Sequence, residues 1–321
     1  ILHAAARLEI ADHLREGPLT VAQLASRCEA KEETLRRFMQ ALVMLGVVSA
    51  QERRGPDEEE RFALTPTGHW LRADVPGSLR ASALMCGDRS FFEAWRACDE
   101  AVRTGRPSFE SAVGASFFEH LDAHPELLNN FQVAMTGFPM VNNLLLETYD
   151  FGSRQAVLDV GGGTGSLVRA IVDRHPDVVG MVLDRPSVIA ANRREGRADD
   201  RISWIGGDFL DAIPSGADTH VLRFVLSDWS DASTVRILTL CRQALPGPEG
   251  RLLIVDNLQP EGQPDFTAAL DMTMLVLTGG AGRTEAAYVE LLQQAGLRHL
   301  ESLTTPARAT IMVAAPDDDA A

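Results

Sequence analysis

The chain has 321 residues, a formal net charge of −15 and an apolar share of 45%, which suffices for one large or two ordinary domains with real cores. The negative charge argues against nucleic acid or an anionic membrane as the main partner, and no apolar run reaches the roughly 20 residues that span a bilayer. The four cysteines form no C-x-x-C pair, so we expect reduced thiols of a cytoplasmic protein and no metal site.

The first 85 residues carry a helix–turn–helix pattern followed by two short strands. Thr20 is the expected N-cap of the helix in "LTVAQLASRC", and "KEETLRRFMQALVMLGVV" predicts a longer helix that ends at Gly46. A strand, the charged tip "ERRGPDEEE" and a second strand come next. This order is typical of a winged helix. Because the wing tip is largely acidic, we expect dimerisation or packing rather than DNA binding.

The remaining chain changes character at about residue 150. Residues 86–150 read as helical and are rich in aromatic and Met side chains, which serve equally well as plain core or as the wall of a ligand site. Residues 151–321 alternate between apolar strands and amphipathic helices. That alternation predicts an α/β fold with a mainly parallel sheet, covered by helices on both faces. Ligands of such sheets bind at the carboxyl ends of the strands.

A glycine-rich turn follows the first of these strands, in "AVLDVGGGTGSLV". Gly161, Gly163 and Gly165 lie between a strand and a helix, where glycine lets the backbone turn tightly and approach a ligand. The spacing is G-x-G-x-G, which departs from the G-x-G-x-x-G of dinucleotide enzymes. The turn alone is a weak signal and also fits a purely structural role.

Acidic and aromatic residues end the next two strands. Asp184 closes "GMVLD" about 20 residues later, where a carboxylate can accept hydrogen bonds from ribose hydroxyls. Asp208 and Phe209 follow the third strand in "GGDF", where they can meet an adenine amino group and cover the base. Three successive strand ends therefore predict a cofactor that contains a nucleoside.

With these motifs, the sequence resembles the two-domain small-molecule O-methyltransferases that use S-adenosylmethionine, including plant phenolic and bacterial polyketide-tailoring enzymes. The motifs "GPLTVAQLA", "LTPTG", "LDVGGGTG", "GDF", "LSDWSD", "RILTLCRQAL", "GRLLIVD" and "RTEAAY" occur in the order typical of that family and span nearly the whole chain. The resemblance implies a Rossmann-like class I methyltransferase domain at 151–321. It also implies a winged-helix-like domain for an intertwined homodimer at 1–85, and a helical connector at 86–150 that contributes to the substrate site.

The resemblance also assigns expected roles to single residues. The expected cofactor-binding residues are Gly161, Gly163, Gly165, Asp184, Asp208, Phe209, Arg223 (usually Lys in the family) and Trp229. The expected substrate-binding residues are Phe131, Met135, Met140, Met274 and Thr278, although plain core packing is an equal alternative for each.

The position of the family's usual catalytic base holds Ser227, in "LSDWSD" instead of the L-H-D-W pattern. Of the two acidic residues that usually steady the base, one matches Asp256 and the other falls at Ala287. A serine hydroxyl cannot take up a proton near pH 7, but it can orient an acceptor. Asp228 is therefore a candidate hydrogen-bond partner or weak base, with capping of the next helix as the alternative. We expect His220, inside a strand, to be a satisfied core histidine.

Three functions remain open on these residues. The first is methyl transfer, most simply O-methylation, to an aromatic or polycyclic natural product without a histidine base. The second keeps S-adenosylmethionine but performs hydroxylation, decarboxylation or a pericyclic step, which the changes at Ser227 and Ala287 motivate equally well. The third is a winged-helix regulator that senses a nucleoside, which the acidic wing disfavours.

Overall fold

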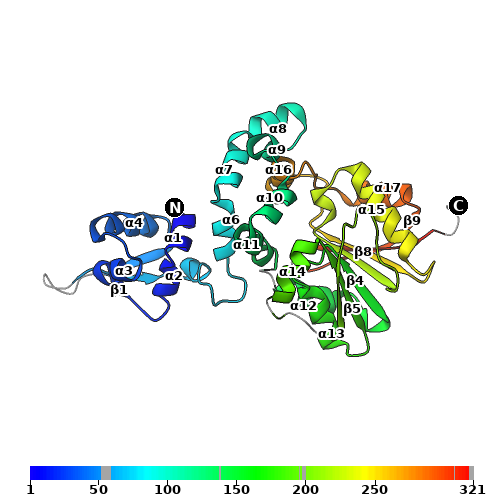
Figure 1. Cartoon of the computed structure of the whole chain (residues 1–321), viewed down its shortest axis with the longest axis horizontal. Helices are drawn as coiled ribbons and strands as arrows, with labels where there is room; N and C mark the ends of the chain where they lie inside the picture. Colours follow the sequence, from blue (N-terminus) through cyan, green and yellow to red (C-terminus); the bar gives the residue numbers. More distant parts are fainter. Residues whose placement is uncertain (52–58, 137–138, 195, 197–199, 307, 318–321) are drawn as a thin grey trace. The chain divides into compact units, whose positions relative to one another are not determined.

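The computed structural model describes residues 1–51, 59–136, 139–194, 196, 200–306 and 308–317. The chain divides into two compact units (Figure 1). Unit 1 comprises Ile1–Phe92 and Pro125–Phe138, and unit 2 comprises Glu93–His124 and Pro139–Ala321. The expected domain boundaries at residues 85 and 150 stay a prediction.

Unit 1 combines short helices with a small antiparallel sheet. Its helices are α1 (Leu2–Arg7), α2 (Ile10–His13), α3 (Val21–Arg27), α4 (Glu32–Met44), α5 (Pro66–His69), α6 (Arg80–Cys86) and α11 (Pro125–Thr136), with α7 (Arg89–Arg96) at its boundary. Its strands are β1 (Leu19–Thr20), β2 (Val48–Gln51) and β3 (Arg61–Leu64), in the order β1-β3-β2.

The winged-helix pattern of the sequence is present in unit 1. Thr20 caps α3 as expected, because its side chain accepts a hydrogen bond from Gln23 N while the Gln23 side chain accepts one from Thr20 N. Strands β2 and β3 pair antiparallel after α4. Most of the expected acidic wing tip lies outside the described residues, at 52–58.

Unit 2 is an α/β domain. Before its sheet come α8 (Cys98–Thr104), α9 (Ser108–Val113), α10 (Phe117–Ala123), α12 (Pro139–Thr148) and the short η1 (Phe151–Ser153). The sheet strands are β4 (Ala156–Val160), β5 (Val179–Asp184), β6 (Ile202–Gly206), β7 (Thr219–Arg223), β8 (Arg251–Asp256), β9 (Leu297–Thr304) and β10 (Thr310–Pro316). Between them lie α13 (Ser166–Arg174), α14 (Pro186–Arg194), η2 (Leu226–Asp228), α15 (Asp231–Ala244), α16 (Thr267–Leu277) and α17 (Glu285–Gln294).

The seven strands of unit 2 have the order β6-β5-β4-β7-β8-β10-β9, and the first five are parallel. The strands that follow β4 in the chain are added on one side of it, whereas the strand that follows β7 is added on the other side, so the strand order reverses between β4 and β7. The connections after β4 and β7 therefore start at the same edge of the sheet and run in opposite directions. Such a reversal is the place where open α/β sheets bind ligands. Strand β10 is antiparallel to both neighbours, and neither β9 nor β10 was expected from the sequence.

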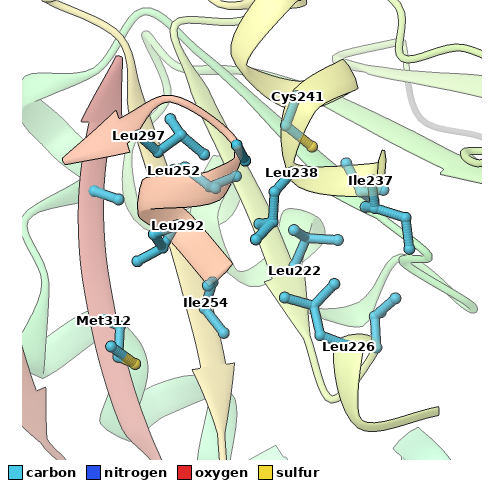
Figure 2. Close-up of a cluster of buried hydrophobic side chains, with 14 of the residues drawn as sticks. Leu222, Leu226, Ile237, Leu238, Cys241, Leu252, Ile254, Leu292, Leu297 and Met312 are labelled. Carbon is cyan, nitrogen blue, oxygen red and sulfur yellow. The ribbon is translucent and has the colours of Figure 1, made fainter. Parts of the chain in front are cut away.

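Apolar side chains alternate between the two faces of this sheet. On one face, α15 and α17 pack over a buried cluster that includes Leu222, Leu238, Leu252, Ile254, Leu292 and Met312 (Figure 2). On the other, α12 and α13 pack on a second cluster that includes Val157, Val221 and Leu253. Neighbouring strand residues such as Val221 and Leu222 therefore enter different cores, as the period of two requires. None of the helices in the described part of the chain is both long and apolar enough to cross a membrane.

His220 lies in the core as expected, but its hydrogen bonds are not satisfied. It is fully buried in β7 between Leu158 and Leu252 of the adjacent strands. Among the described residues, neither of its ring nitrogens has a hydrogen-bond partner. Burial lowers the pKa of His220 to about 4, against a smaller raising effect of Asp218. The ring is therefore neutral in the folded protein at neutral pH.

This buried ring should make the stability of unit 2 sensitive to acid. The unfolded His220 takes up a proton near its ordinary pKa of about 6.5, whereas the folded one does so only near 4. Stability is thus present above about pH 6.5 and falls as the pH drops toward 4. We expect His220 alone to cost about 2 kcal/mol of unfolding free energy between about pH 7 and pH 5. Urea unfolding of His220→Leu should lack this component, whereas exposed His124→Gln should retain it. An unchanged pH dependence in His220→Leu would contradict the assignment.

Candidate functional site

The turn between β4 and α13 is built from glycines in a left-handed conformation. Gly161, Gly163 and Gly165 have φ values of 72°, 55° and 69°. Added side chains would also meet close neighbours: a Cβ on Gly161 would lie 2.8 Å from Val225 Cγ2, and one on Gly165 would lie 2.5 Å from the Trp204 ring. Both conformation and space therefore require glycine at this turn.

The carboxylate of Asp184 holds this turn from the neighbouring strand. Its Oδ2 accepts from Gly163 N at 2.8 Å, and its Oδ1 accepts from Arg185 N at 2.7 Å. On the other side of the turn, the Asn192 amide donates to Gly163 O at 2.8 Å. Burial raises the pKa of Asp184, and the two backbone hydrogen bonds oppose that rise. Each carboxylate oxygen keeps lone pairs for a ligand hydroxyl.

A buried pair of opposite charges lies beneath the same turn. Asp159 is 1% exposed, and burial raises its pKa to about 6, while the charge of Arg223 lowers it and that of Asp184 raises it. Arg223 donates from Nη1 to Asn142 Oδ1 at 3.1 Å. Within the described residues, Asp159 Oδ2 and Arg223 Nε are buried without hydrogen-bond partners. Buried polar atoms of this kind normally find a partner, so they indicate a place for a polar ligand.

Three aromatic rings gather at the ends of β6 and β7. Trp229 stacks on Phe118 of α10 with ring centroids 5.9 Å apart, and Phe209 meets Trp229 edge-on at 5.6 Å. Arg185 fixes α10 here, because its guanidinium lies 5.0 Å from the Phe118 ring centroid and donates to Phe118 O at 2.7 Å. Asp208 uses Oδ1 to accept from Leu210 N. The expected residues Asp208, Phe209 and Trp229 thus share one region with Phe118.

Ser227, Asp228 and Asp256 come together where β7 and β8 end. Asp256 is 6% exposed and accepts from the Tyr288 hydroxyl at 2.6 Å and from Asn257 N at 2.8 Å, and the nearby Ser227 hydroxyl lowers its pKa. Burial raises the pKa of Asp256 in spite of these bonds. Burial and the charge of Asp256 raise the pKa of half-buried Asp228 to about 7. Helix capping, the alternative for Asp228, is performed by Ser230, whose side chain accepts from Ser233 N.

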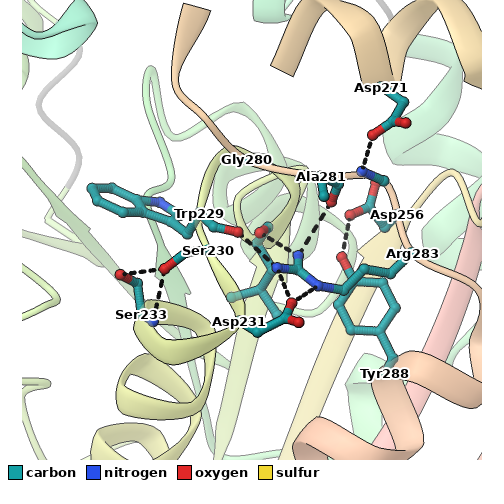
Figure 3. Close-up of polar contacts among 12 residues, drawn as sticks. Trp229, Ser230, Asp231, Ser233, Asp256, Asp271, Gly280, Ala281, Arg283 and Tyr288 are labelled. Atoms are coloured by element: carbon teal, nitrogen blue, oxygen red, sulfur yellow. Dashed lines mark hydrogen bonds and ion pairs between the residues drawn. The ribbon is translucent and has the colours of Figure 1, made fainter. Parts of the chain in front are cut away.

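Arg283 joins these elements from the segment before α17. It is 5% exposed, and Figure 3 shows its guanidinium among the backbone oxygens of the turn that leads into α15. Nη1 donates to Leu226 O at 2.8 Å and Nη2 donates to Trp229 O at 2.7 Å. Nε and Nη2 both donate to Asp231 Oδ1, at 2.9 and 2.8 Å.

Comparison with known proteins decides the family. An O-methyltransferase domain model matches residues 95–298, and an O-methyltransferase dimerisation domain model matches residues 1–74. The chain belongs to the O-methyltransferase family. It is therefore an S-adenosylmethionine-dependent methyltransferase with a Rossmann-like catalytic fold, as the resemblance implied.

Individual members of this O-methyltransferase family resemble the chain over nearly its full length. It is 35% identical to the phenazine O-methyltransferase of Lysobacter antibioticus, over 98% of this chain and 92% of that protein. It is 34% identical to the 8-amino-8-demethylriboflavin N,N-dimethyltransferase of Streptomyces davaonensis, over 92% and 85%. The crystal structure of human N-acetylserotonin methyltransferase in complex with S-adenosylmethionine aligns with a TM-score of 0.89 at 26% identity, covering 98% of this chain and 93% of that one.

The residues at the reversal of the sheet fit this cofactor. The positive-φ glycine turn and Asp184 suit a nucleoside, and the rings of Phe209 and Trp229 suit an adenine base. The orphaned atoms of Asp159 and Arg223 suit the ammonium and carboxylate of an amino acid. The assignment of each of these residues to a part of the cofactor remains a proposal.

The expected acceptor residues divide between the two units. Phe131 and Met135 belong to unit 1, and Met135 is exposed. The side chain of Met140 lies outside the described residues. In unit 2, Met274 and Thr278 are half-buried, and the Thr278 hydroxyl donates to Met274 O at 3.0 Å while it accepts from Gly280 N. Contact of any of the five with a substrate stays a prediction.

Five residues around the site were not singled out from the sequence: Asp159, Asn142, Asn192, Phe118 and Arg283. Asp159 stands in the quoted motif "LDVGGGTG" and Arg283 opens "RTEAAY", so both had a local signal. Asn142, Asn192 and Phe118 reach the site from helices through the tertiary fold, at sequence separations of 81, 29 and 67 residues from their partners. Nothing in their local sequence marks them.

Removal of the Asp184 carboxylate should weaken cofactor binding. Asp184→Ala releases Gly163 N and removes the expected acceptor of ribose hydroxyls, so we expect S-adenosylhomocysteine to bind at least about tenfold more weakly, which is about 1.4 kcal/mol. Titration calorimetry measures this directly. Exposed Asp177→Ala in the same unit is the matched control and should bind like the unmodified enzyme. Equal affinities for the two variants would rule out this role of Asp184.

Proposed function

We propose that this O-methyltransferase methylates a hydroxyl or amino group of an aromatic or polycyclic natural product without a histidine base, and that Asp228 accepts the proton of the acceptor. When bound, S-adenosylmethionine supplies an activated methyl group on a positively charged sulfur. The chain's own residues must then align the acceptor and free its lone pair. The observation that carries the proposal is the Ser227–Asp228–Asp256 cluster at the carboxyl ends of β7 and β8.

The protonation of Asp228 supports its role as the base. An ordinary carboxylate has a pKa near 4 and takes up protons poorly at neutral pH. Burial and the nearby Asp256 raise the pKa of Asp228 to about 7. A base works best when its pKa lies near the working pH, so Asp228 approaches the proton affinity of the imidazole that Ser227 replaces.

In this proposal Ser227 orients the acceptor and does not accept its proton. Its hydroxyl lies near Asp256 and lowers the pKa of that carboxyl, and the Tyr288 hydroxyl donates to the same carboxylate. The lone pairs of Ser227 remain for the hydrogen of an acceptor hydroxyl or amine. In balanced terms, the acceptor lone pair forms the new bond to the methyl carbon, the carbon–sulfur bond breaks with its electron pair going to sulfur, and the acceptor proton passes to Asp228.

The charge of the cluster favours some acceptors over others. Asp228 and Asp256 are two neighbouring carboxylates, and a carboxylate or phenolate acceptor brought beside them would meet like charge. A neutral phenol, a hydroxylated heterocycle or an aromatic amine meets no such repulsion. Both O- and N-methyltransferases occur among the relatives, in keeping with this acceptor range.

The reaction itself is tested by product analysis. Incubation with S-adenosylmethionine and a panel of aminophenols, hydroxyphenazines and naphthols should give products heavier by one methyl group, with one S-adenosylhomocysteine formed per product. Turnover of an acceptor without S-adenosylhomocysteine would instead select hydroxylation, decarboxylation or a pericyclic step. Full inactivity toward the panel, with cofactor shown to bind, would count against the proposal.

The role of Asp228 predicts a specific pH profile. Because the base acts in its deprotonated form, kcat/KM should rise as the pH increases through about 7. Asp228→Asn should lower kcat by about 10²-fold or more and remove this limb, whereas Ser227→Ala should lose less than about tenfold. Ser227→His in the Asp228→Asn background should restore part of the rate, since it returns an imidazole. A profile that is the same in the unmodified enzyme and in Asp228→Asn would eliminate Asp228 as the base.

We further propose that the enzyme acts as a homodimer through its N-terminal domain. The dimerisation-domain match covers residues 1–74. In the same region Met44, Leu45 and Trp70 are 73%, 43% and 46% exposed, and a second copy would remove such apolar side chains from water. Light scattering should give twice the mass of the chain; the mass of a monomer would contradict the proposal.

A further inference from the structure

The turn at residues 226–231 has little regular structure of its own, although it carries the candidate base. It connects β7 to α15 and contains the single short turn η2. The carbonyl oxygens of Leu226 and Trp229 both accept from the guanidinium of Arg283. Asp231, at the start of α15, accepts from the same group. One side chain therefore bonds the beginning, the middle and the end of the 226–231 turn.

We propose that Arg283 is a positioning residue for methyl transfer, which holds the 226–231 turn so that Ser227, Asp228 and Trp229 keep one fixed arrangement. The proposal rests on the proposed function for the roles of Ser227 and Asp228. It goes beyond that function because it assigns the order of the turn to a residue 52 to 57 positions further along the chain. Arg283 itself stays away from the chemistry and acts through the backbone.

The geometry of the contacts requires arginine rather than any cation. A guanidinium presents five donors in a rigid plane, and here its three nitrogens serve a carboxylate and the carbonyls of Leu226, Trp229 and Ala281 at once. The lysine ammonium is a single point on a flexible stem and cannot span the same acceptors. The Asp231 side chain is 75% exposed whereas that of Arg283 is 4% exposed, so the ion pair alone gives no reason to bury the guanidinium. The three backbone carbonyls that accept from it give that reason.

The segment around Arg283 also lies directly against the turn. A Cβ on Gly280 would fall 2.1 Å from Ser227 O and 2.5 Å from Asp228 C, so the two backbones are in contact. Asp271 of α16 accepts from Gly282 N at 2.7 Å and holds this segment to its helix. Arg283 is thus mounted on a fixed support, as a positioning role demands.

A third contact links Arg283 to the carboxylates. Its guanidinium carbon lies 5.6 Å from the centroid of the Tyr288 ring, and the Tyr288 hydroxyl donates to Asp256. The charge of Arg283 lowers the pKa of Asp256. The charged groups around it are Asp231, which is exposed on the far side of the guanidinium, and the coupled pair Asp228 and Asp256. Loss of the cation should therefore raise the apparent pKa of that pair.

The test compares Arg283→Met and Arg283→Lys with Arg201→Met. Arg201 is a matched control in unit 2, because it too donates to a backbone carbonyl and an aspartate, Val172 O and Asp173 Oδ1, both at 2.8 Å. These two acceptors lie on α13, away from the 226–231 turn. The full-length enzyme is used throughout, and each variant is compared at matched concentrations of folded protein.

Each variant is characterised by two measurements, hydrogen exchange and steady-state kinetics. Hydrogen exchange of the peptide that covers residues 224–232 reports the order of the turn without any substrate. We expect exchange at least about tenfold faster in both Arg283 variants and unchanged exchange in Arg201→Met. With an acceptor, kcat should fall by about 10²-fold in Arg283→Met and Arg283→Lys, the scale that misplacement of a reacting group can reach, while KM for the acceptor changes less.

The pH profile separates positioning from general stabilisation. The acid limb of kcat/KM should move to higher pH in Arg283→Met, which loses the charge, and stay in place in Arg283→Lys, which keeps it. If Arg283→Met does not fold, Asp231→Ala removes one exposed acceptor and should give an intermediate increase in exchange. The proposal would be overturned if the Arg283 variants matched Arg201→Met both in hydrogen exchange at residues 224–232 and in kcat. Faster exchange without any detectable turnover in the unmodified enzyme would instead fault the proposed function and leave the positioning role standing.

Discussion

The backbone that leaves β7 must find hydrogen bonds for carbonyls that no longer belong to the sheet, and the guanidinium of Arg283 supplies them. The cation is itself satisfied by Leu226 O, Trp229 O and Asp231. A buried charge is stable only when it has such partners. The same contacts fix the direction in which Ser227 and Asp228 leave the strand. The contacts that order the backbone of the turn therefore also order the candidate catalytic side chains.

The acid–base character of the site arises from burial. Ser227, at the position where the resemblance leads us to expect an imidazole, cannot carry a proton near neutral pH. Two carboxylates placed close together in a poorly solvated region raise each other's proton affinity. Tyr288 and Ser227 direct their hydroxyls at Asp256 and favour its charged form. Among the described residues Asp228 receives no such hydrogen bond, and burial and the charge of Asp256 raise its pKa to about 7.

Much of the fold could be predicted from the sequence because the signals are local. The alternation of buried strands and amphipathic helices, the cap at Thr20 and the glycines after β4 each depend on a few neighbouring residues. Strand β9 escaped prediction because its exposure pattern lacks clean alternation, whereas β10 is as continuously buried as the predicted strands β4 and β8 and carried the same local signal. The end of an apolar strand led to Asp184 and a family motif led to Asp256, whereas Asn142, Asn192 and Phe118 approach from helices and depend on tertiary packing. The isolated buried ring of His220 could not be foreseen, since only the packed sheet shows that no described residue pairs with it.

Gly280 and the neighbouring helix α16 differ in the substitutions that they can accept. Any larger residue there would collide with the peptide between Ser227 and Asp228, whatever rotamer it adopted. On α16, a few residues earlier, Leu270 is 41% exposed and Phe266, which precedes the helix, is 49% exposed. Substitutions therefore have scope at these exposed positions, while the junction at Gly280 has to be carried over unchanged.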